Sequence, residues 1–217
     1  MSLFLKICGL RTPEAVAVAL DGGASHVGFI FFPKSPRNVS PHEAAALREP
    51  VRGRADAVAV SVDADDALLG AIVDEVRPDI LQLHGHETPE RVTAVRARFG
   101  LPVIKALPVR DEADLRAAGR YAGIADHLLF DAKPPPDAAL PGGNGITFDW
   151  TLLDAAPAAP FFLSGGLNRA NLAEALRSRP AGLDVSSGVE SAPGVKDLAL
   201  IRAFLGEARA LSQEFRP

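Results

Sequence analysis

Short apolar runs recur along the whole chain, separated by more polar stretches. They occupy residues 3–8, 26–32, 56–62, 80–84, 102–107, 126–131, 161–164 and 183–186. Most of these runs are rich in β-branched and aromatic side chains and too apolar for a strand with one face in water. We therefore predict eight strands that are buried on both faces.

Helix signals lie between the predicted strands. Thr12 is a candidate N-cap, Pro13 stands in the first turn, and Val16 and Leu20 follow at helical spacing. Asp65 is a second candidate cap. Further helices are predicted at 88–95, 111–118, 148–155 and 168–176, and a last one carries Leu198, Ile201, Leu205 and Ala208 on one face.

This alternation is a strand–helix repeat taken eight times in 217 residues. Both a (β/α)₈ barrel and a doubly wound sheet use that local pattern, so periodicity alone does not separate them. The count of eight favours the barrel, as does the lack of a G-x-G-x-x-G turn after the first strand. We predict one barrel domain over residues 1–217, with the Pro/Gly-rich stretch 132–148 as an active-site loop rather than a linker.

Composition narrows the classes of partner. The net charge of −4 gives no electrostatic footprint for nucleic acid or an anionic membrane, and no apolar run is long enough for a membrane helix. A single cysteine excludes an internal disulfide and a multi-thiolate metal site, which suits a reducing cytoplasm. No signal peptide is evident at the start of the chain. We expect a cytoplasmic protein.

Chemistry in such a barrel gathers at the carboxyl ends of the strands. Small residues follow the last two predicted strands, at Gly165, Gly166, Ser186, Ser187 and Gly188. Backbone N–H groups exposed by such turns bind anions, and the loops after strands seven and eight are the usual phosphate site of this fold. Plain tight turns would use the same residues. Their joint position favours a phosphate site.

Two side chains at strand ends suit proton transfer. The lone Cys8 ends the first strand, and Lys6 shares its inward face, so the ammonium would favour the thiolate. An isolated cysteine is otherwise a small buried hydrophobe. Asp131 closes the sixth strand, where a partly desolvated carboxyl group serves as a proton donor or, alternatively, as a helix cap.

Two further polar residues stand near the same rim. Arg37, in "FPKSPRNVS", can donate two parallel hydrogen bonds to a substrate carboxylate, although such an arginine is often only a surface residue. His84, in "HGH", suggests a metal pair with His86, but no third ligand is evident in the sequence. We predict no metal and treat His84 as polar lining of the substrate site.

Several motifs, in order, resemble the phosphoribosylanthranilate isomerase family of tryptophan biosynthesis. They are "KICGL" (6–10), "GFIFFPKSPRNVSP" (28–41), "LQLHGHE" (81–87), "VIKAL" (103–107), "FDA" (130–132), "GGNGITFDW" (142–150), "LSGGLN" (163–168), "DVSSGVES" (184–191) and "GVKD" (194–197). The resemblance covers nearly the whole chain. It implies a (β/α)₈ barrel and a cofactor-free Amadori rearrangement of a phosphosugar, from an aminoaldose to an aminoketose.

The resemblance also implies residue roles. Cys8 takes the place of the family's general base, Asp131 of its general acid, and Arg37 of the arginine that meets the anthranilate carboxylate. Asp184 and Lys105 match family positions, and we expect supporting roles for them beside Lys6. Family members often carry lysine where this chain has Ile146, so that contact is not carried over, whereas backbone phosphate contacts from Gly143 and Gly145 are.

Two other functions fit part of the pattern. The aminoaldose isomerase of histidine biosynthesis runs a similar reaction but has an aspartate at the end of strand one, where this chain has Cys8. A non-catalytic phosphate-binding barrel would keep the glycine and serine turns but need neither Cys8 nor Asp131. The sequence leaves open whether the protein is a monomer or a homodimer.

Overall fold

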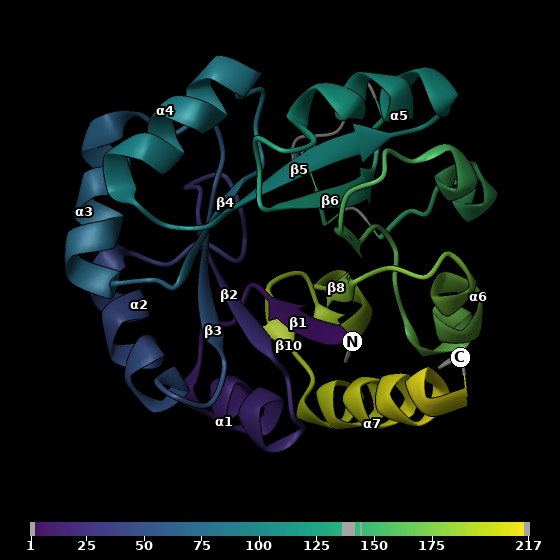
Figure 1. The fold of residues 1–217 in the computed structure, drawn as a ribbon. Coiled ribbons are helices and arrows are strands. Elements are labelled where there is room, and N and C mark those ends of the chain that lie inside the picture. Colours follow the sequence, from purple (N-terminus) through teal and green to yellow (C-terminus); the bar gives the residue numbers. More distant parts are fainter. Residues whose placement is uncertain (1–2, 136–141, 144, 215–217) are drawn as a thin grey trace.

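The computed structural model describes residues 3–135, 142–143 and 145–214, so residues 136–141 and 144 of the predicted active-site loop lie outside it. Eight parallel strands close into a barrel ringed by helices (Figure 1). The strands are β1 Phe4–Cys8, β2 His26–Phe31, β3 Asp56–Ser61, β4 Ile80–Leu83, β5 Val103–Val109, β6 His127–Ala132, β7 Phe161–Leu163 and β8 Gly182–Val185. Strand β1 pairs with both β2 and β8, which excludes an open doubly wound sheet and confirms the barrel.

The helices cover the outer face of the barrel (Figure 1). They are α1 Pro13–Asp21, α2 Pro41–Arg48, α3 Asp66–Val76, α4 Pro89–Phe99, α5 Glu112–Ala118, α6 Leu172–Arg177 and α7 Leu198–Glu214, with 3₁₀ turns at Glu49–Val51, Gly119–Tyr121, Trp150–Ala155, Arg169–Asn171 and Ser187–Val189. Thr12, Asp65 and Thr88 each accept a hydrogen bond from the backbone N–H three residues later, which confirms the predicted caps at Thr12 and Asp65 and shows a third at Thr88. Within the described ranges, every helix is too short or too polar to span a lipid bilayer.

Four elements differ from the sequence prediction. The predicted helix at 148–155 is instead a 3₁₀ turn over Trp150–Ala155, and a second 3₁₀ turn shortens the predicted helix at 168–176 to α6. Helix α2, opened by a capping box between Ser40 and Glu43, lies where we predicted none. After β8 the chain forms a small antiparallel hairpin, β9 Glu190–Ala192 with β10 Val195–Lys196, which was also missed.

Side chains point alternately into and out of the barrel along each strand, and the inward ones fill its interior. The inward side chains include Cys8, Val58, Val60, Ile80, Ile104, Ala106, Leu129 and Phe162, which form one apolar cluster. The outward side chains join the larger core beneath the helices. Because each strand presents every second residue to the interior, the last inward residues of the strands ring one mouth of the barrel.

The opposite, amino-terminal mouth is closed by aromatic rings in contact with one another. His26 and His127 each meet Phe162 edge to face, with ring centroids 5.3 Å and 5.5 Å apart. Burial lowers the pKa of His26 to about 4, and the nearby Lys6 charge adds to that effect. Asp56 lies 3.6 Å from the ring, but its side chain is half exposed, so solvent screens its attraction and burial dominates.

Acid should therefore destabilise the fold through His26. The neutral form is required in the folded state, whereas the unfolded chain binds a proton near the usual pKa of 6.5. The stabilisation from neutral His26 is fully present above pH 6.5 and decreases as the pH drops toward 4, by roughly 2–3 kcal/mol between about pH 7 and pH 4.5. Urea unfolding of the wild type and of His26→Gln measures it. The wild type should lose more stability than the variant over this interval, and equal losses would contradict the assignment.

Candidate functional site

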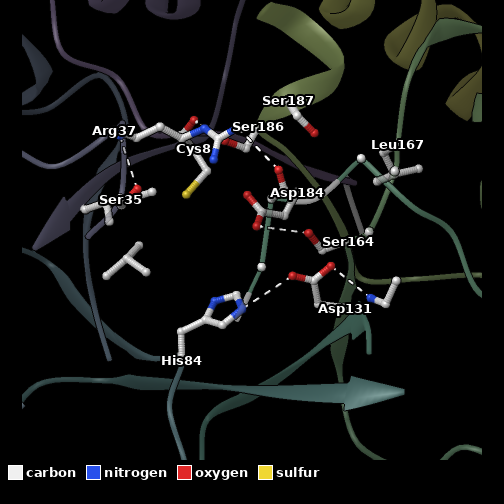
Figure 2. Close-up of a pocket in the computed structure, with 18 of the residues that line it drawn as sticks. Cys8, Ser35, Arg37, His84, Asp131, Ser164, Leu167, Asp184, Ser186 and Ser187 are labelled. Atoms are coloured by element: carbon white, nitrogen blue, oxygen red, sulfur yellow. Dashed lines mark hydrogen bonds and ion pairs between the residues drawn. The ribbon is translucent and has the colours of Figure 1, made fainter. Parts of the chain in front are cut away.

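A pocket of about 780 Å³, counting its open mouth, lies at the carboxyl ends of the strands. Eleven of the thirteen predicted site residues line it: Cys8, Arg37, His84, Asp131, Gly143, Gly145, Gly165, Gly166, Asp184, Ser186 and Ser187. Cys8 and Asp131 face the pocket from β1 and β6, on different walls (Figure 2). Lys6 lies beneath the lining, and Gly188 lies behind it.

Cys8 sits above a buried ion pair. Lys6 is fully buried, and its Nζ donates a hydrogen bond to Asp184 Oδ1 at 2.8 Å. Burial opposes the charge on Lys6, but Asp184 and Cys8 together outweigh it and the pKa of Lys6 is raised. Burial also raises the pKa of the Cys8 thiol, and the attraction of Lys6 offsets only part of that rise. Lys6 thus favours the thiolate, as the sequence suggested, but the desolvation of the thiol outweighs that attraction.

Gly28, on β2, makes room for the thiol and was not singled out in the sequence. It pairs with Cys8 in the barrel register. A Cβ at this position would lie 2.8 Å from Cys8 Sγ and 3.3 Å from Lys6 Nζ. Both atoms therefore pack against the bare face of Gly28, and a side chain there would displace them.

Asp131 is buried and held from two directions. Its Oδ1 accepts a hydrogen bond from the backbone N–H of Ala132 at 2.9 Å, and its Oδ2 lies 3.4 Å from His84 Nε2 (Figure 2). A Cβ on Gly142 would come within 2.6 Å of Oδ2 and 2.8 Å of Nε2, so the chain passes closely over both groups. The carboxyl group is thus fixed in direction at the pocket wall.

Arg37 is not a free surface arginine. Its Nε and Nη2 donate to Glu190 Oε1 and Oε2 at 2.7 Å and 2.8 Å, which is a bidentate pair. Its side chain is 5% exposed, and a Cβ on Gly143 would lie 2.6 Å from its Nη1. The guanidinium therefore enters the pocket already oriented, with its Nη1 edge toward the glycine loop.

Glu190 and Lys196 are site residues that the sequence reading missed. Both come from the β9–β10 hairpin, and Lys196 Nζ donates to Glu190 Oε1 at 2.7 Å and to the Ser186 carbonyl at 2.9 Å. Burial lowers the pKa of Lys196, although Glu190 counteracts it. The quoted motifs "DVSSGVES" and "GVKD" hold both residues, but only their contact in the fold shows that they orient Arg37.

The predicted phosphate turns form one side of the pocket. Four glycines of these turns have a positive φ, between 61° and 85°, which residues with a side chain rarely adopt: Gly143, Gly145, Gly165 and Gly166. The Ser186 hydroxyl donates to the Cys8 carbonyl at 3.1 Å, which ties the loop after β8 to the end of β1. Backbone N–H groups in such turns suit a phosphate.

Gly188 has a packing role rather than a place in the pocket lining. A Cβ there would overlap the carbonyl oxygen of Leu167, so this glycine lets the loops after β7 and β8 approach each other.

Other polar residues near the rim have structural partners. Lys105 Nζ donates to Glu87 Oε2 and to the Gly85 carbonyl, both at 2.8 Å, and so braces the loop that carries His84. His86 points to solvent beside Asp63 and is not brought together with His84. In the part of the chain that the structure describes, no group of three or more His, Cys, Asp or Glu side chains could hold a metal ion. Ile146 lines the pocket and is partly exposed.

Known proteins match the chain along nearly its full length. A family model described as N-(5'phosphoribosyl)anthranilate isomerase matches residues 5–207. Proteins named N-(5'-phosphoribosyl)anthranilate isomerase from Chelativorans sp. and Brucella canis are 60% and 62% identical. The first match covers 97% of each chain, and the second covers 94% of this chain and 93% of the relative.

Solved structures agree with the sequence relatives. Phosphoribosyl anthranilate isomerase from Thermus thermophilus is 34% identical with a TM-score of 0.85, and the match covers 96% of this chain and 100% of that one. A structure of this isomerase in complex with reduced 1-(o-carboxyphenylamino)-1-deoxyribulose 5-phosphate is 32% identical, covers the same shares, and has a TM-score of 0.83. The chain belongs to the N-(5'-phosphoribosyl)anthranilate isomerase family.

Proposed function

We propose that this isomerase converts N-(5'-phosphoribosyl)anthranilate to 1-(2-carboxyphenylamino)-1-deoxyribulose 5-phosphate in this pocket, with Asp131 as general acid and Cys8 as general base. The observation that carries the proposal is the placement of a thiol and a carboxyl group on different walls of one pocket that has glycine turns along one side. No cofactor is required by the reaction, because every step is a proton transfer or an electron shift within the substrate.

The first step opens the sugar ring. Asp131 gives its proton to the furanose ring oxygen, the bond from carbon 1 to that oxygen breaks, and the nitrogen lone pair forms a Schiff base. Asp131 is fixed by the Ala132 N–H, which leaves its carboxyl group directed along the pocket wall. A positioned acid of this kind typically contributes about 10²–10⁴-fold to the rate.

The second step removes a proton from carbon 2. Cys8 Sγ takes it, the electrons of that bond form the enolamine, and the iminium nitrogen becomes neutral. Enolamine and aminoketone then interconvert by proton shifts. The buried thiol must ionise to act, and Lys6, held charged by Asp184, favours the thiolate. Cys8 is thus assigned as a base and not as a nucleophile.

Three groups would hold the substrate in place. The turns with Gly143, Gly145, Gly165 and Gly166, together with Ser186, Ser187 and Gly188, are assigned to the phosphate, with Gly188 acting by keeping the loops close. His84 and Asp184 line the sugar site, and Lys6 supports it from below. Arg37 is assigned to the anthranilate carboxylate, since its oriented guanidinium matches a planar anion.

A turnover assay tests the reaction. The purified protein is mixed with phosphoribosylanthranilate, and loss of the substrate's fluorescence is followed. The proposal predicts rapid loss that depends on enzyme concentration. No turnover would overturn it, and turnover of the corresponding histidine-pathway aminoaldose alone would favour the rival isomerase.

The assignment of Arg37 predicts a change in KM. In Arg37→Lys, a compact ammonium cannot donate twice to Glu190 and still face the substrate, so the KM for phosphoribosylanthranilate should rise about tenfold or more. The matched comparison is phosphoribosylaniline, which lacks the carboxylate and whose KM the substitution should hardly change. An equal rise for both substrates would show that Arg37 only supports the loop.

The single-domain organisation over residues 1–217, the cytoplasmic location and the monomeric or homodimeric state are also proposals. An isomerase from Thermotoga maritima is described as dimeric and as convertible to monomers, so either state is compatible with this family. Analytical ultracentrifugation of the purified chain distinguishes them.

A further inference from the structure

Gln82 is a fully buried polar residue of the barrel interior. It lies on β4, two residues before His84, and both side chains line the pocket. Its amide nitrogen Nε2 lies 3.1 Å from His84 Nδ1. With the amide in this orientation, its nitrogen donates and Nδ1 accepts. Neutral His84 therefore carries its proton on Nε2.

That proton points at the proposed acid. His84 Nε2 lies 3.4 Å from Asp131 Oδ2, and the other oxygen, Oδ1, already accepts from the Ala132 N–H at 2.9 Å. The distance from Nε2 to Oδ2 is long for a hydrogen bond, as is common for catalytic contacts before substrate binds. The close passage of Gly142 over both atoms restricts the space in which they can move apart.

We propose that Gln82 is a positioning residue that holds His84 in the Nε2–H form, so that its ring N–H stabilises the carboxylate left on Asp131 after proton delivery. The inference rests on the proposed role of Asp131 as the acid. When the proton moves from Asp131 to the ring oxygen, the electrons of the O–H bond stay on the carboxylate in a buried pocket. A donor already aimed at that charge lowers the barrier without reorganising.

The remaining partners of His84 do not supply this function. The ring is 16% exposed and is a neighbour of Gly142 on the side of Nε2. The charged groups of the same mouth are paired elsewhere: Lys105 with Glu87, Arg37 with Glu190, and Lys6 with Asp184. Gln82 is thus the side chain that sets the tautomer, in the way that hydrogen bonds to one imidazole nitrogen fix the proton on the other.

A double-mutant cycle tests the coupling. Gln82→Met keeps the length of the side chain but removes the donor, so kcat should fall about tenfold while the KM changes less than about twofold. His84→Gln removes the ring and should lower kcat at least as much. Because Gln82 acts through His84, adding Gln82→Met to His84→Gln should cause no further loss.

A second variant gives a readout that packing alone would not move. Gln82→Glu presents acceptors to Nδ1, so a neutral ring would place its proton there and turn a lone pair toward Asp131. An imidazolium donates from both nitrogens. The ratio of the variant's kcat to the wild-type kcat should therefore fall as pH rises, because only the imidazolium form of the variant donates to Asp131, whereas a packing defect would leave that ratio independent of pH.

The matched control is Ile104→Met. Ile104 pairs with Gln82 in the barrel register and is equally buried, but it does not line the pocket. Its kcat should stay within about twofold of the wild type. A wild-type kcat in Gln82→Met, or a Gln82→Met loss that persists in the His84→Gln background, would overturn the inference. If Asp131→Asn keeps normal turnover, the proposed acid falls instead, so the two failures are distinguishable.

Discussion

Replacing Asp131 with asparagine should lower kcat by about 10²–10⁴-fold while the protein stays folded. Asparagine has nearly the same shape and can still accept the hydrogen bond from the Ala132 N–H. It has no acidic proton for the ring oxygen, so the sugar ring would open only slowly. The KM should change little, because the phosphate turns and Arg37 are untouched. Fluorescence-monitored steady-state kinetics measures both constants.

The control separates chemistry from folding. Asp74→Asn makes the same chemical change on the exposed face of α3 and should leave kcat unchanged. Urea unfolding of Asp131→Asn should give a midpoint close to that of the wild type. Near-normal turnover by Asp131→Asn would exclude Asp131 as the acid. A much lower urea midpoint for this variant would indicate that Asp131 has a structural role instead.

Replacing Cys8 with alanine or serine should also lower kcat by about 10²–10⁴-fold. Alanine removes the proton acceptor, and a serine hydroxyl holds its proton far more firmly than a thiol. Burial raises the pKa of Cys8, so the thiolate fraction of the wild type grows as pH rises. The ratio of the wild-type kcat to the kcat of Cys8→Ser should therefore increase toward alkaline pH, because both proteins use the same acid, Asp131, and only the wild type has the thiol.

Cys8→Ser is the more informative of the two variants because serine and cysteine are similar in size. The side chain packs against Gly28 and Lys6, and serine fills nearly the same space without opening a cavity. A near-wild-type kcat in this variant would exclude Cys8 as the base and leave the family assignment intact. Full inactivation of Cys8→Ala with normal activity of Cys8→Ser would indicate a packing role.

The barrel could be predicted because each of its strands has a recognisable pattern in the local sequence. Each inner strand is a short, almost wholly apolar run, and three helices open with a capping side chain that the sequence shows directly. Helix α2 was not predicted because its buried face consists only of Ala44, Leu47 and Arg48, which form a weak apolar stripe. The stretch at 150–155 tightened into a 3₁₀ turn, a form that apolar spacing over so few residues does not distinguish from an α-helix.

The rim residues could be collected from the strand ends, but their partners could not. Glu190 reaches Arg37 across 153 positions of sequence through a hairpin that carries no strong strand signal. The state of Cys8 depends on a balance between burial and Lys6, and only the fold sets the burial. The tautomer of His84 likewise follows from a contact with Gln82 that spacing suggests but does not establish.

The most direct measurement is a crystal structure of this protein with reduced 1-(o-carboxyphenylamino)-1-deoxyribulose 5-phosphate, the compound present in a solved relative. We expect the phosphate at the glycine turns, Cys8 Sγ within about 3.5 Å of carbon 2, and an Asp131 oxygen equally close to the oxygen derived from the sugar ring. A sugar bound with carbon 2 turned away from Cys8, or with Asp131 out of reach of that oxygen, would contradict the assignment of base and acid.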